Sequence, residues 1–174
     1  MIEALQDNLI EDPEMKKQYL ATILKEIERL SGLINDLFDL SKLEFEQVDF
    51  HPSFTHLDKV LLDVLESHSV LLEDKQINVQ LVVPDTLPRL LIMPCKIERV
   101  IGNLLHNAIR YSPISGTIEL TVVENKLTQQ VQFTLRDEGI GISPNDQLRV
   151  FERFFRTDRS RSSQSGGSGL GLAI

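Results

Sequence analysis

Cysteine, positive charge and long apolar runs are all scarce in this 174-residue chain. Cys95 is the single cysteine, so the chain can form no internal disulfide and offers no cysteine cluster for a metal. No stretch approaches the roughly 18 to 20 apolar residues that a membrane span needs. Lys and Arg number 18 against 26 Asp and Glu, and the net charge of −8 argues against general binding to nucleic acids or anionic membranes. Any phosphate group must therefore be held by a local site.

A long amphipathic helix is predicted over residues 19–44. Its apolar side chains recur at alternating spacings of four and three, which is typical of helices that pack against other helices. This seam consists of Ile23, Ile27, Leu30, Ile34 and Leu37. We predict a helix start at Pro13, and we expect residues 1–46 to be part of a helical hairpin through which two copies associate. The alternative is a single surface helix that docks on the following domain.

Residues 47–174 are predicted to form a second domain of mixed helices and strands. Helices are predicted at 57–75, 96–112 and 144–158, with another beginning at 169, and strands at 48–54, 77–83, 87–93, 116–125 and 129–139. The last two strands should be antiparallel, joined by a turn at Lys126, Leu127 and Thr128. The predicted fold class is α+β: a two-layer sandwich of a mixed, largely antiparallel sheet covered by helices on one face, preceded by the helical hairpin.

Four short segments of the second domain have residue types suited to chemistry: 103–111, 137–142, 151–156 and 166–172. The last of these contains Gly167, Gly169 and Gly171 ahead of a predicted helix. Glycines let the backbone approach a ligand closely, and a helix N-terminus presents free N–H groups, so this segment could cradle phosphates. The alternative is a flexible linker, because a short motif alone has a real false-positive rate.

Two other segments offer polar side chains at defined positions. Asp137 opens an Asp-x-Gly-x-Gly turn after a strand, where one carboxylate could accept a hydrogen bond from an exocyclic amine such as that of adenine. Asn103, Asn107 and Arg110 lie on one face of the predicted helix. Amide oxygens and a guanidinium suit a hydrated Mg²⁺ that carries a polyphosphate. The alternatives are a plain strand-end turn and an ordinary polar helix surface.

Taken in order, the four segments resemble the N, G1, F and G2 boxes of the sensor histidine kinases, whose ATP-binding fold is shared with gyrase-type, Hsp90-type and MutL-type ATPases. The segment DLFDLSKLE, at 36–44, is similar to the end of that family's second dimerisation helix, and residues 2–23 are similar to the stretch after its H box. The resemblance implies that the phosphate-accepting histidine lies before Met1. It also implies that the family's last strands are missing, so the chain is expected to be incomplete at both ends.

The resemblance implies a role for each residue of the first two boxes. Asn107 would ligate Mg²⁺, Arg110 would contact phosphate, and Tyr111 would pack along the nucleotide. Asn103 occupies the position where the hydrolytic ATPase relatives have a glutamate, and an amide cannot act as a general base for water. Asp137 would bind the adenine amine, and the pocket floor would be shaped by Gly139 and Gly141.

In the other two boxes the resemblance implies a lid over the nucleotide. Phenylalanines would anchor this lid at Phe151, Phe154 and Phe155, although phenylalanines at such spacing are usually core residues. Arg153 and Arg156 would be charge partners for phosphate or for the hairpin. The lid itself would span 159–165, and the triphosphate would be lined by Gly167, Gly169 and Gly171.

The four histidines do not fit the role of phosphate acceptor. His51 and His56 are predicted in the strand region after the hairpin, and His68 on a surface helix. His106 lies inside the Asn segment, but it is left outside the predicted site because a lone helical histidine is usually structural or solvent-facing. By itself the chain is therefore not expected to autophosphorylate.

The function implied by the resemblance is that of an ATP-dependent protein-histidine kinase with ATP and Mg²⁺ as cofactors. Its partners would be a second copy, bound through the hairpin, and a response regulator that receives the phosphoryl group. The chain would be the cytoplasmic portion of a protein anchored in the bacterial membrane through parts outside this sequence. Two alternatives stay open: a hydrolytic ATPase of the same fold, and a non-catalytic module that only dimerises or binds a regulator.

Overall fold

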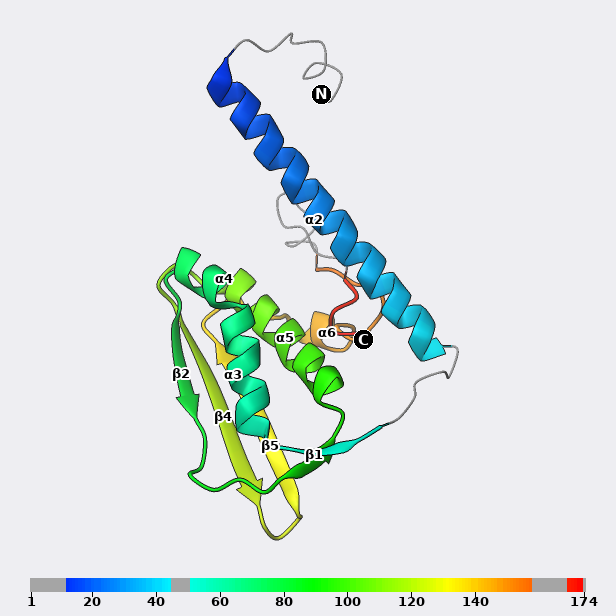
Figure 1. Cartoon of the computed structure of the whole chain (residues 1–174), viewed down its shortest axis with the longest axis vertical. Coiled ribbons are helices and arrows are strands. Elements are labelled where there is room, and N and C mark those ends of the chain that lie inside the picture. The colour runs from blue at the N-terminus through cyan, green and yellow to red at the C-terminus, as the bar shows by residue number, and fades with distance from the viewer. Residues whose placement is uncertain (1–11, 45–50, 158–168, 174) are drawn as a thin grey trace. The chain divides into compact units, whose positions relative to one another are not determined.

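The computed structural model describes residues 12–44, 51–157 and 169–173, which divide into two compact units (Figure 1). Among these residues, the first unit contains 12–44, 153–157 and 169–170. The second unit contains 51–152 and 171–173. The first is dominated by one helix, whereas the second contains every strand of the described residues.

Helix α2 of the first unit spans Pro13–Glu44 and confirms the helix start predicted at Pro13. The carboxylate of Asp12 accepts a hydrogen bond from the backbone N–H of Glu14 at 2.9 Å, which satisfies one of the free donors at this helix end. Residues 1–11, which would supply the other arm of the predicted hairpin, lie outside the described residues.

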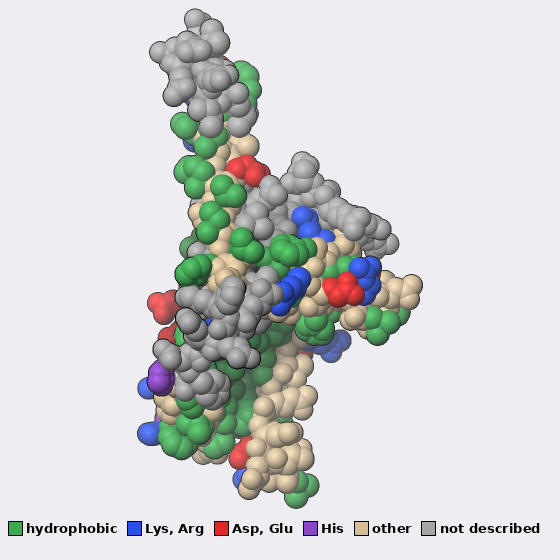
Figure 2. Space-filling view, turned by 90° about the vertical axis from the view of Figure 1, so that its right-hand side faces the viewer, with side chains coloured by type: hydrophobic (Ala, Val, Ile, Leu, Met, Phe, Trp, Pro, Cys, Tyr) green, Lys and Arg blue, Asp and Glu red, His purple; other side chains and the backbone are tan. Residues whose placement is uncertain are grey.

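The apolar stripe of α2 is exposed within this chain. Large apolar side chains along its length are each about half or more exposed, and Figure 2 shows hydrophobic side chains gathered along this helix. The stripe is formed by Met15, Leu20, Leu24, Ile27, Leu30, Ile34, Leu37 and Phe38. Since exposed apolar patches of this size mark interaction surfaces, the helix has the character of an interface.

The second unit is built on a three-stranded sheet in the order β2-β4-β5. Strand β2, Asn78–Val82, pairs parallel with β4, Thr117–Asn125, and β4 pairs antiparallel with β5, Gln130–Asp137. A separate antiparallel ribbon joins β1, Ser53–Thr55, to β3, Leu90–Ile92. The predicted mixed, largely antiparallel sheet is thereby confirmed.

Three helices cover one face of the sheet, as predicted: α3, Leu57–Ser67; α4, Ser69–Asp74; and α5, Pro94–Tyr111 (Figure 1). Strand β4 alternates between buried and half-buried residues over most of its length, because one of its two faces looks into the core. The buried side chains of these elements form one cluster that includes Leu61, Leu105, Ile118, Leu120 and Val122. The α+β, two-layer fold forms because the apolar faces of α3 and α5 pack against the apolar face of β4.

One predicted helix is divided in the structure. Instead of a single helix over 57–75, α3 ends at Ser67 and α4 begins at Ser69. Two side chains lie within hydrogen-bonding distance of the Val64 carbonyl oxygen, the hydroxyl of Ser67 at 2.8 Å and Nδ1 of His68 at 2.9 Å. Side-chain donors that compete for a helical carbonyl in this way favour interruption of the helix.

The last two predicted helices are also wrong. The helix expected over 144–158 is limited to α6, Pro144–Gln147, and residues 171–173 form a turn. After α6 the backbone continues through tight i-to-i−3 bonds, from Arg149 N–H to the Asp146 carbonyl and from Glu152 N–H to the Arg149 carbonyl. Short helices need a buried apolar face, and here Leu148 and Phe151 are exposed.

No helix among the described residues is both long enough and apolar enough to cross a membrane.

We predict that Leu120→Ala lowers the free energy of unfolding by about 2 to 5 kcal/mol, because the side chain is fully buried at the centre of the sheet and its loss leaves a cavity. Leu127→Ala is the matched control, since Leu127 is 97% exposed in the β4–β5 turn and should change stability by less than about 0.5 kcal/mol. Urea unfolding followed by circular dichroism measures both. Equal effects would show that β4 is not the centre of the core.

Candidate functional site

Helix α5 presents a polar face next to its apolar one. Asn103, Asn107 and Arg110 are half-buried on this helix, at spacings that place them on one side. The side-chain amide of Asn103 donates a hydrogen bond to the backbone carbonyl of Gly171 at 2.7 Å. Asn103 of the first predicted segment and Gly171 of the last are therefore in contact, although 68 positions separate these two residues in the chain.

One nitrogen of the Arg110 guanidinium has no hydrogen-bond partner. This atom, Nη2, is buried. The Cζ atom of the same group lies 5.2 Å from the centre of the Tyr111 ring, in the range of a cation–π contact. A buried charged donor without a partner is costly in a protein interior, so this one is suited to bind an anion.

The Asp137 turn packs against the end of α5. Oδ1 of Asp137 accepts a hydrogen bond from the N–H of Gly139 at 2.8 Å, which folds the chain back after β5. A Cβ added to Gly139 would lie 2.5 Å from that oxygen and 3.1 Å from the carbonyl oxygen of Tyr111. A side chain at position 139 would displace the Asp137 carboxylate and crowd the Tyr111 carbonyl, so glycine favours the close packing of this turn against the end of the helix.

The second glycine of the turn has a different requirement. Gly141 has a φ of +67°, and a Cβ added there would meet no atom within 4 Å. Position 141 favours glycine because of its positive φ, whereas position 139 favours glycine because a Cβ there would lie too close to its neighbours.

The phenylalanine segment and the glycine-rich segment touch within the first unit. Gly169 has a φ of +72°, and a Cβ added to it would lie 2.8 Å from the backbone carbon of Phe154 and 2.9 Å from the carbonyl oxygen of Phe155. Phe154 itself has a φ of +62°, which is strained for a bulky side chain. Backbone strain of this kind clusters at binding and switch regions.

The phenylalanines are mostly not core residues. Phe151 is 71% exposed and Phe154 is 60% exposed, while Phe155 is half-buried, so the ordinary core interpretation is wrong for the first two. Arg156 is half-buried, and Arg153 is exposed. Gly167 and the predicted lid at 159–165 lie outside the described residues.

The residues of the second unit fit a nucleotide with its metal better than they fit a protein-held metal. Among the described residues, no group of three or more His, Cys, Asp or Glu side chains is placed to hold a metal ion. Mg²⁺ is usually bound through one or two protein oxygens together with substrate phosphates. The buried, unpaired Nη2 of Arg110 meets the charge requirement of such a phosphate.

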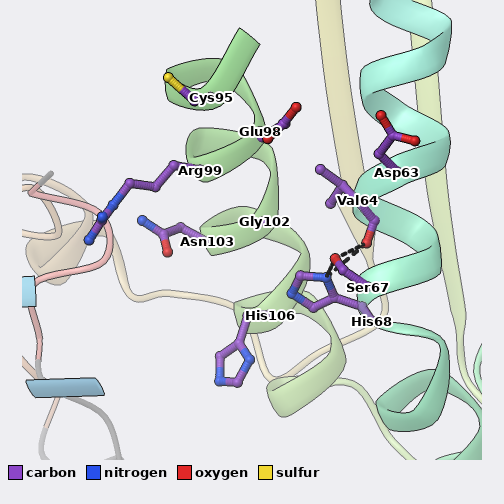
Figure 3. Close-up of a pocket in the computed structure, with 10 residues that line it drawn as sticks. All are labelled: Asp63, Val64, Ser67, His68, Cys95, Glu98, Arg99, Gly102, Asn103 and His106. Atoms are coloured by element: carbon purple, nitrogen blue, oxygen red, sulfur yellow. Dashed lines mark hydrogen bonds between the residues drawn. The ribbon is translucent and has the colours of Figure 1, made fainter. Parts of the chain in front are cut away.

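An open groove of about 690 Å³ lies between α3 and α5. Its walls carry the carboxylates of Asp63 and Glu98 and the imidazoles of His68 and His106, while Asn103 points away from α3 (Figure 3). The two carboxylates outnumber the one guanidinium of the lining, that of Arg99, so the charge of this groove does not favour a polyphosphate.

The two imidazoles of the groove influence each other. The rings of His68 and His106 lie edge to face with their centroids 6.4 Å apart. Desolvation lowers the pKa of His106 below its ordinary value of 6.5, and the nearby charges of His68 and Arg110 lower it further. These surroundings disfavour the charged form of the His106 imidazole.

Lys75 at the end of α4 was missed by the sequence reasoning. Its ammonium group donates hydrogen bonds to the carbonyl oxygens of Ile109 and Arg110 at 2.8 Å and of Ser112 at 2.9 Å. One sequence signal could have indicated such a partner. Pro113 lacks an N–H, so it leaves the Ile109 carbonyl without its helical donor.

Two family profiles match the chain. Residues 94–174 match the profile described as "Histidine kinase-, DNA gyrase B-, and HSP90-like ATPase". Residues 1–46 match the profile described as "His Kinase A (phospho-acceptor) domain".

Curated relatives align with nearly the whole chain. "Histidine protein kinase SaeS" of Staphylococcus aureus (strain bovine RF122 / ET3-1) is 32% identical over 173 residues, which cover 99% of this chain and 49% of SaeS. "Sensor histidine kinase WalK" of Bacillus subtilis (strain 168) is 31% identical over 175 residues, which cover 99% of this chain and 28% of WalK. The chain therefore spans about half the length of SaeS and less than a third of WalK.

Solved structures share the fold. The crystal structure of full-length ShkA in complex with AMPPNP superposes with a TM-score of 0.75 at 25% sequence identity. The match covers 90% of this chain and 32% of ShkA.

We predict that the imidazole of His106 titrates below pH 6.5 in an NMR titration of its ring proton, because its surroundings disfavour the charged form. Removing one cause with His68→Gln should raise the midpoint part of the way back, whereas His51→Gln, outside the groove, should leave it unchanged.

The lowered pKa of His106 also determines how its protonation changes the stability of the fold with pH. The unfolded chain takes up this proton first, so the contribution of His106 to stability is present above about pH 6.5 and is lost as the pH falls. A midpoint at or above 6.5 would contradict the assigned environment.

Proposed function

Because this chain belongs to the sensor histidine kinases and carries their dimerisation and ATPase-type regions, we propose that it binds Mg-ATP and donates the γ-phosphoryl group to a histidine. The observation that supports this best is the polar end of α5, where Nη2 of Arg110 is buried without a hydrogen-bond partner and the carbonyl of the next residue, Tyr111, lies against the turn of Asp137 and Gly139. One end of that arrangement offers a cation for phosphate, and the other offers a carboxylate for an amine.

The adenine end of the nucleotide is assigned to the Asp137 turn. The carboxylate of Asp137 accepts the exocyclic amine, with Gly139 and Gly141 keeping the floor of the pocket free of side chains. Tyr111 packs along the nucleotide, beside the Arg110 guanidinium that it already contacts.

The phosphate end is assigned to α5. Arg110 pairs with phosphate oxygens, and Asn107 offers its amide oxygen to Mg²⁺, which would neutralise charge on the polyphosphate. From the family resemblance alone, nucleotide-binding roles are also proposed for Phe151, Phe154, Arg156, Gly167, Gly169 and Gly171. Positioning and charge neutralisation are the main contributions that a protein makes to phosphoryl transfer.

The acceptor imidazole is proposed to come from a histidine outside these 174 residues. The segment that matches the phospho-acceptor profile, 1–46, contains no histidine. The exposed apolar stripe of α2 supports association of two copies through this region. A response-regulator aspartate would then receive the phosphoryl group, and the chain would act on the cytoplasmic side of a membrane-anchored kinase.

The amide side chain of Asn103 favours phosphoryl transfer to histidine over ATP hydrolysis. Its amide nitrogen donates to the Gly171 carbonyl, and an amide has no basic group with which to activate water. Asn103 is therefore proposed to act by holding the backbone of Gly171 at α5.

We predict that the chain binds a fluorescent ATP analogue in a Mg²⁺-dependent manner. Asp137→Asn should weaken binding at least about tenfold because it removes a charged acceptor, and Asn107→Ala should abolish most of the Mg²⁺ dependence while preserving the helix. Asp74→Asn, an exposed carboxylate at the end of α4, is the matched control and should bind like the unmodified chain.

Fluorescence anisotropy with and without EDTA gives the affinities, and circular dichroism shows that each variant is folded. A folded chain that binds no nucleotide would favour the interaction-module alternative. If it binds, transfer of radiolabel from γ-labelled ATP to an added histidine-bearing dimerisation domain tests the kinase activity, and release of free phosphate instead would favour the hydrolase.

A further inference from the structure

Helix α5 ends in a way that leaves several carbonyl groups without helical donors. Its last helical bond runs from the N–H of Ser112 to the carbonyl of Ala108 at 2.9 Å. In a continuing helix the next carbonyl, that of Ile109, would accept from residue 113, but Pro113 has no N–H. Ser112 has already turned to an extended conformation, with φ −65° and ψ 150°, so the helix cannot supply further donors.

The ammonium group of Lys75 supplies these donors from another part of the fold. It bonds the carbonyl oxygens of Ile109 and Arg110 at 2.8 Å and that of Ser112 at 2.9 Å, which matches all three of its N–H groups. A cation at this position also faces the negative end of the helix dipole. Unlike a solvated surface lysine, this side chain is half-buried and fully occupied.

The backbone that carries Lys75 is itself tied to the same corner of the fold. The carbonyl of Lys75 accepts from the N–H of Ser115 at 2.9 Å, and the Ser115 hydroxyl donates to Oε1 of Gln76 at 3.0 Å. The N–H of Asn78 donates to the Gly116 carbonyl at 2.9 Å. Hydrogen bonds therefore join the connection from α4 to β2 and the connection from α5 to β4. They fix the position of the backbone from which the Lys75 side chain extends.

The three carbonyls that Lys75 holds lie at and beside residues of the proposed nucleotide site. One of them belongs to Arg110, and Tyr111 lies between two of them in the chain. The carbonyl of Tyr111, which Lys75 does not bond, is the group against which Gly139 packs. The end of α5 is thus held between Lys75 on one side and the Asp137 turn on the other.

We propose that Lys75 is a positioning residue for the nucleotide site: it sets the backbone of residues 109–112 so that Arg110 and Tyr111 are aligned with Asp137. This inference rests on the proposed nucleotide binding. Lys75 touches no reacting group in this scheme and acts only through the carbonyls that it holds. Without it, three carbonyls would be left to water, and the last turn of α5 would be free to fray.

Three variants test this role. Lys75→Met keeps a long apolar stem but removes the charge and all donors. Lys75→Arg keeps the charge, but a planar guanidinium cannot direct its donors at three converging carbonyls as an ammonium does. Lys59→Met is the matched control, because Lys59 is exposed on α3 and makes none of these bonds.

Affinity for the Mg-ATP analogue is the first readout, measured at a temperature where circular dichroism shows each variant folded. Lys75→Met should lose at least about tenfold in affinity, Lys75→Arg should lose less, and Lys59→Met should bind like the unmodified chain. A merely structural lysine would lower the melting temperature and leave the affinity of the folded protein unchanged. If Lys75→Met binds the analogue as tightly as the unmodified chain, the proposal is overturned. If Lys75→Met does not fold, the proposal is overturned when Lys75→Arg binds the analogue as tightly as the unmodified chain.

The second readout needs no nucleotide and separates this proposal from the proposed function. NMR signals of the Arg110 side chain should be shifted by the ring current of Tyr111, because Cζ lies 5.2 Å from the ring centre. Lys75→Met should reduce this shift, and Lys59→Met should keep it. If the unmodified chain binds no nucleotide, the nucleotide-site assignment fails, and an unchanged Arg110 shift in Lys75→Met would separately refute the positioning of Arg110 by Lys75.

Discussion

Helix α5 has to bury its apolar face in the core while its polar face stays accessible to a ligand. The rest of the second unit depends on this constraint. Ile101, Leu105, Ala108 and Ile109 are buried in the core. Their spacing fixes the rotation of the helix about its axis, because turning the polar face inward would expose these apolar groups to water. Asn103, Asn107 and Arg110 are thus directed by the packing of side chains that take no part in the proposed chemistry.

Both ends of α5 are determined by proline. Pro94 begins the helix at a position where its missing N–H is not needed, and Pro113 follows its end. The two ends have different consequences, since a missing donor costs nothing at the start of a helix but leaves carbonyls unsatisfied at its end. Lys75 satisfies those carbonyls, and its contribution joins two connections of the fold at the point where the polar face of α5 ends.

Two buried polar groups near the same point stay unsatisfied. The Nη2 of Arg110 and the hydroxyl of Ser112 are buried without partners, although neighbouring backbone groups are well paired. Natural proteins leave few such groups, and each one lowers stability unless something binds it. Their position at the end of α5, against which the turn of Gly139 packs, is consistent with a surface that is completed by a ligand.

Predictions from the sequence were best where a local pattern was long and regular. The alternation in β4 and β5 and the periodicity of α2 and α5 gave elements that the structure confirms, because each pattern reflects one continuous face against one environment. The helix over 57–75 was divided because Ser67 and His68 compete for the Val64 carbonyl, a local hydrogen-bond effect that periodicity does not reveal. The helix predicted over the phenylalanine-rich segment 144–158 does not extend beyond Gln147, because the exposed Leu148, Phe151 and Phe154 provide no packing to stabilise it.

By itself, the sequence determined the types of the main elements, their apolar faces and the polar residues of the candidate site. Each of these depends on neighbours within a few turns or a few strand positions. Only the tertiary structure decided that Asn103 meets Gly171, that Gly139 approaches Tyr111 and that Lys75 holds the end of α5. These contacts join residues 28 to 68 positions apart, as for Tyr111 with Gly139 and Asn103 with Gly171, and they form because the whole core, rather than any local pattern, sets the distances between helix and turn.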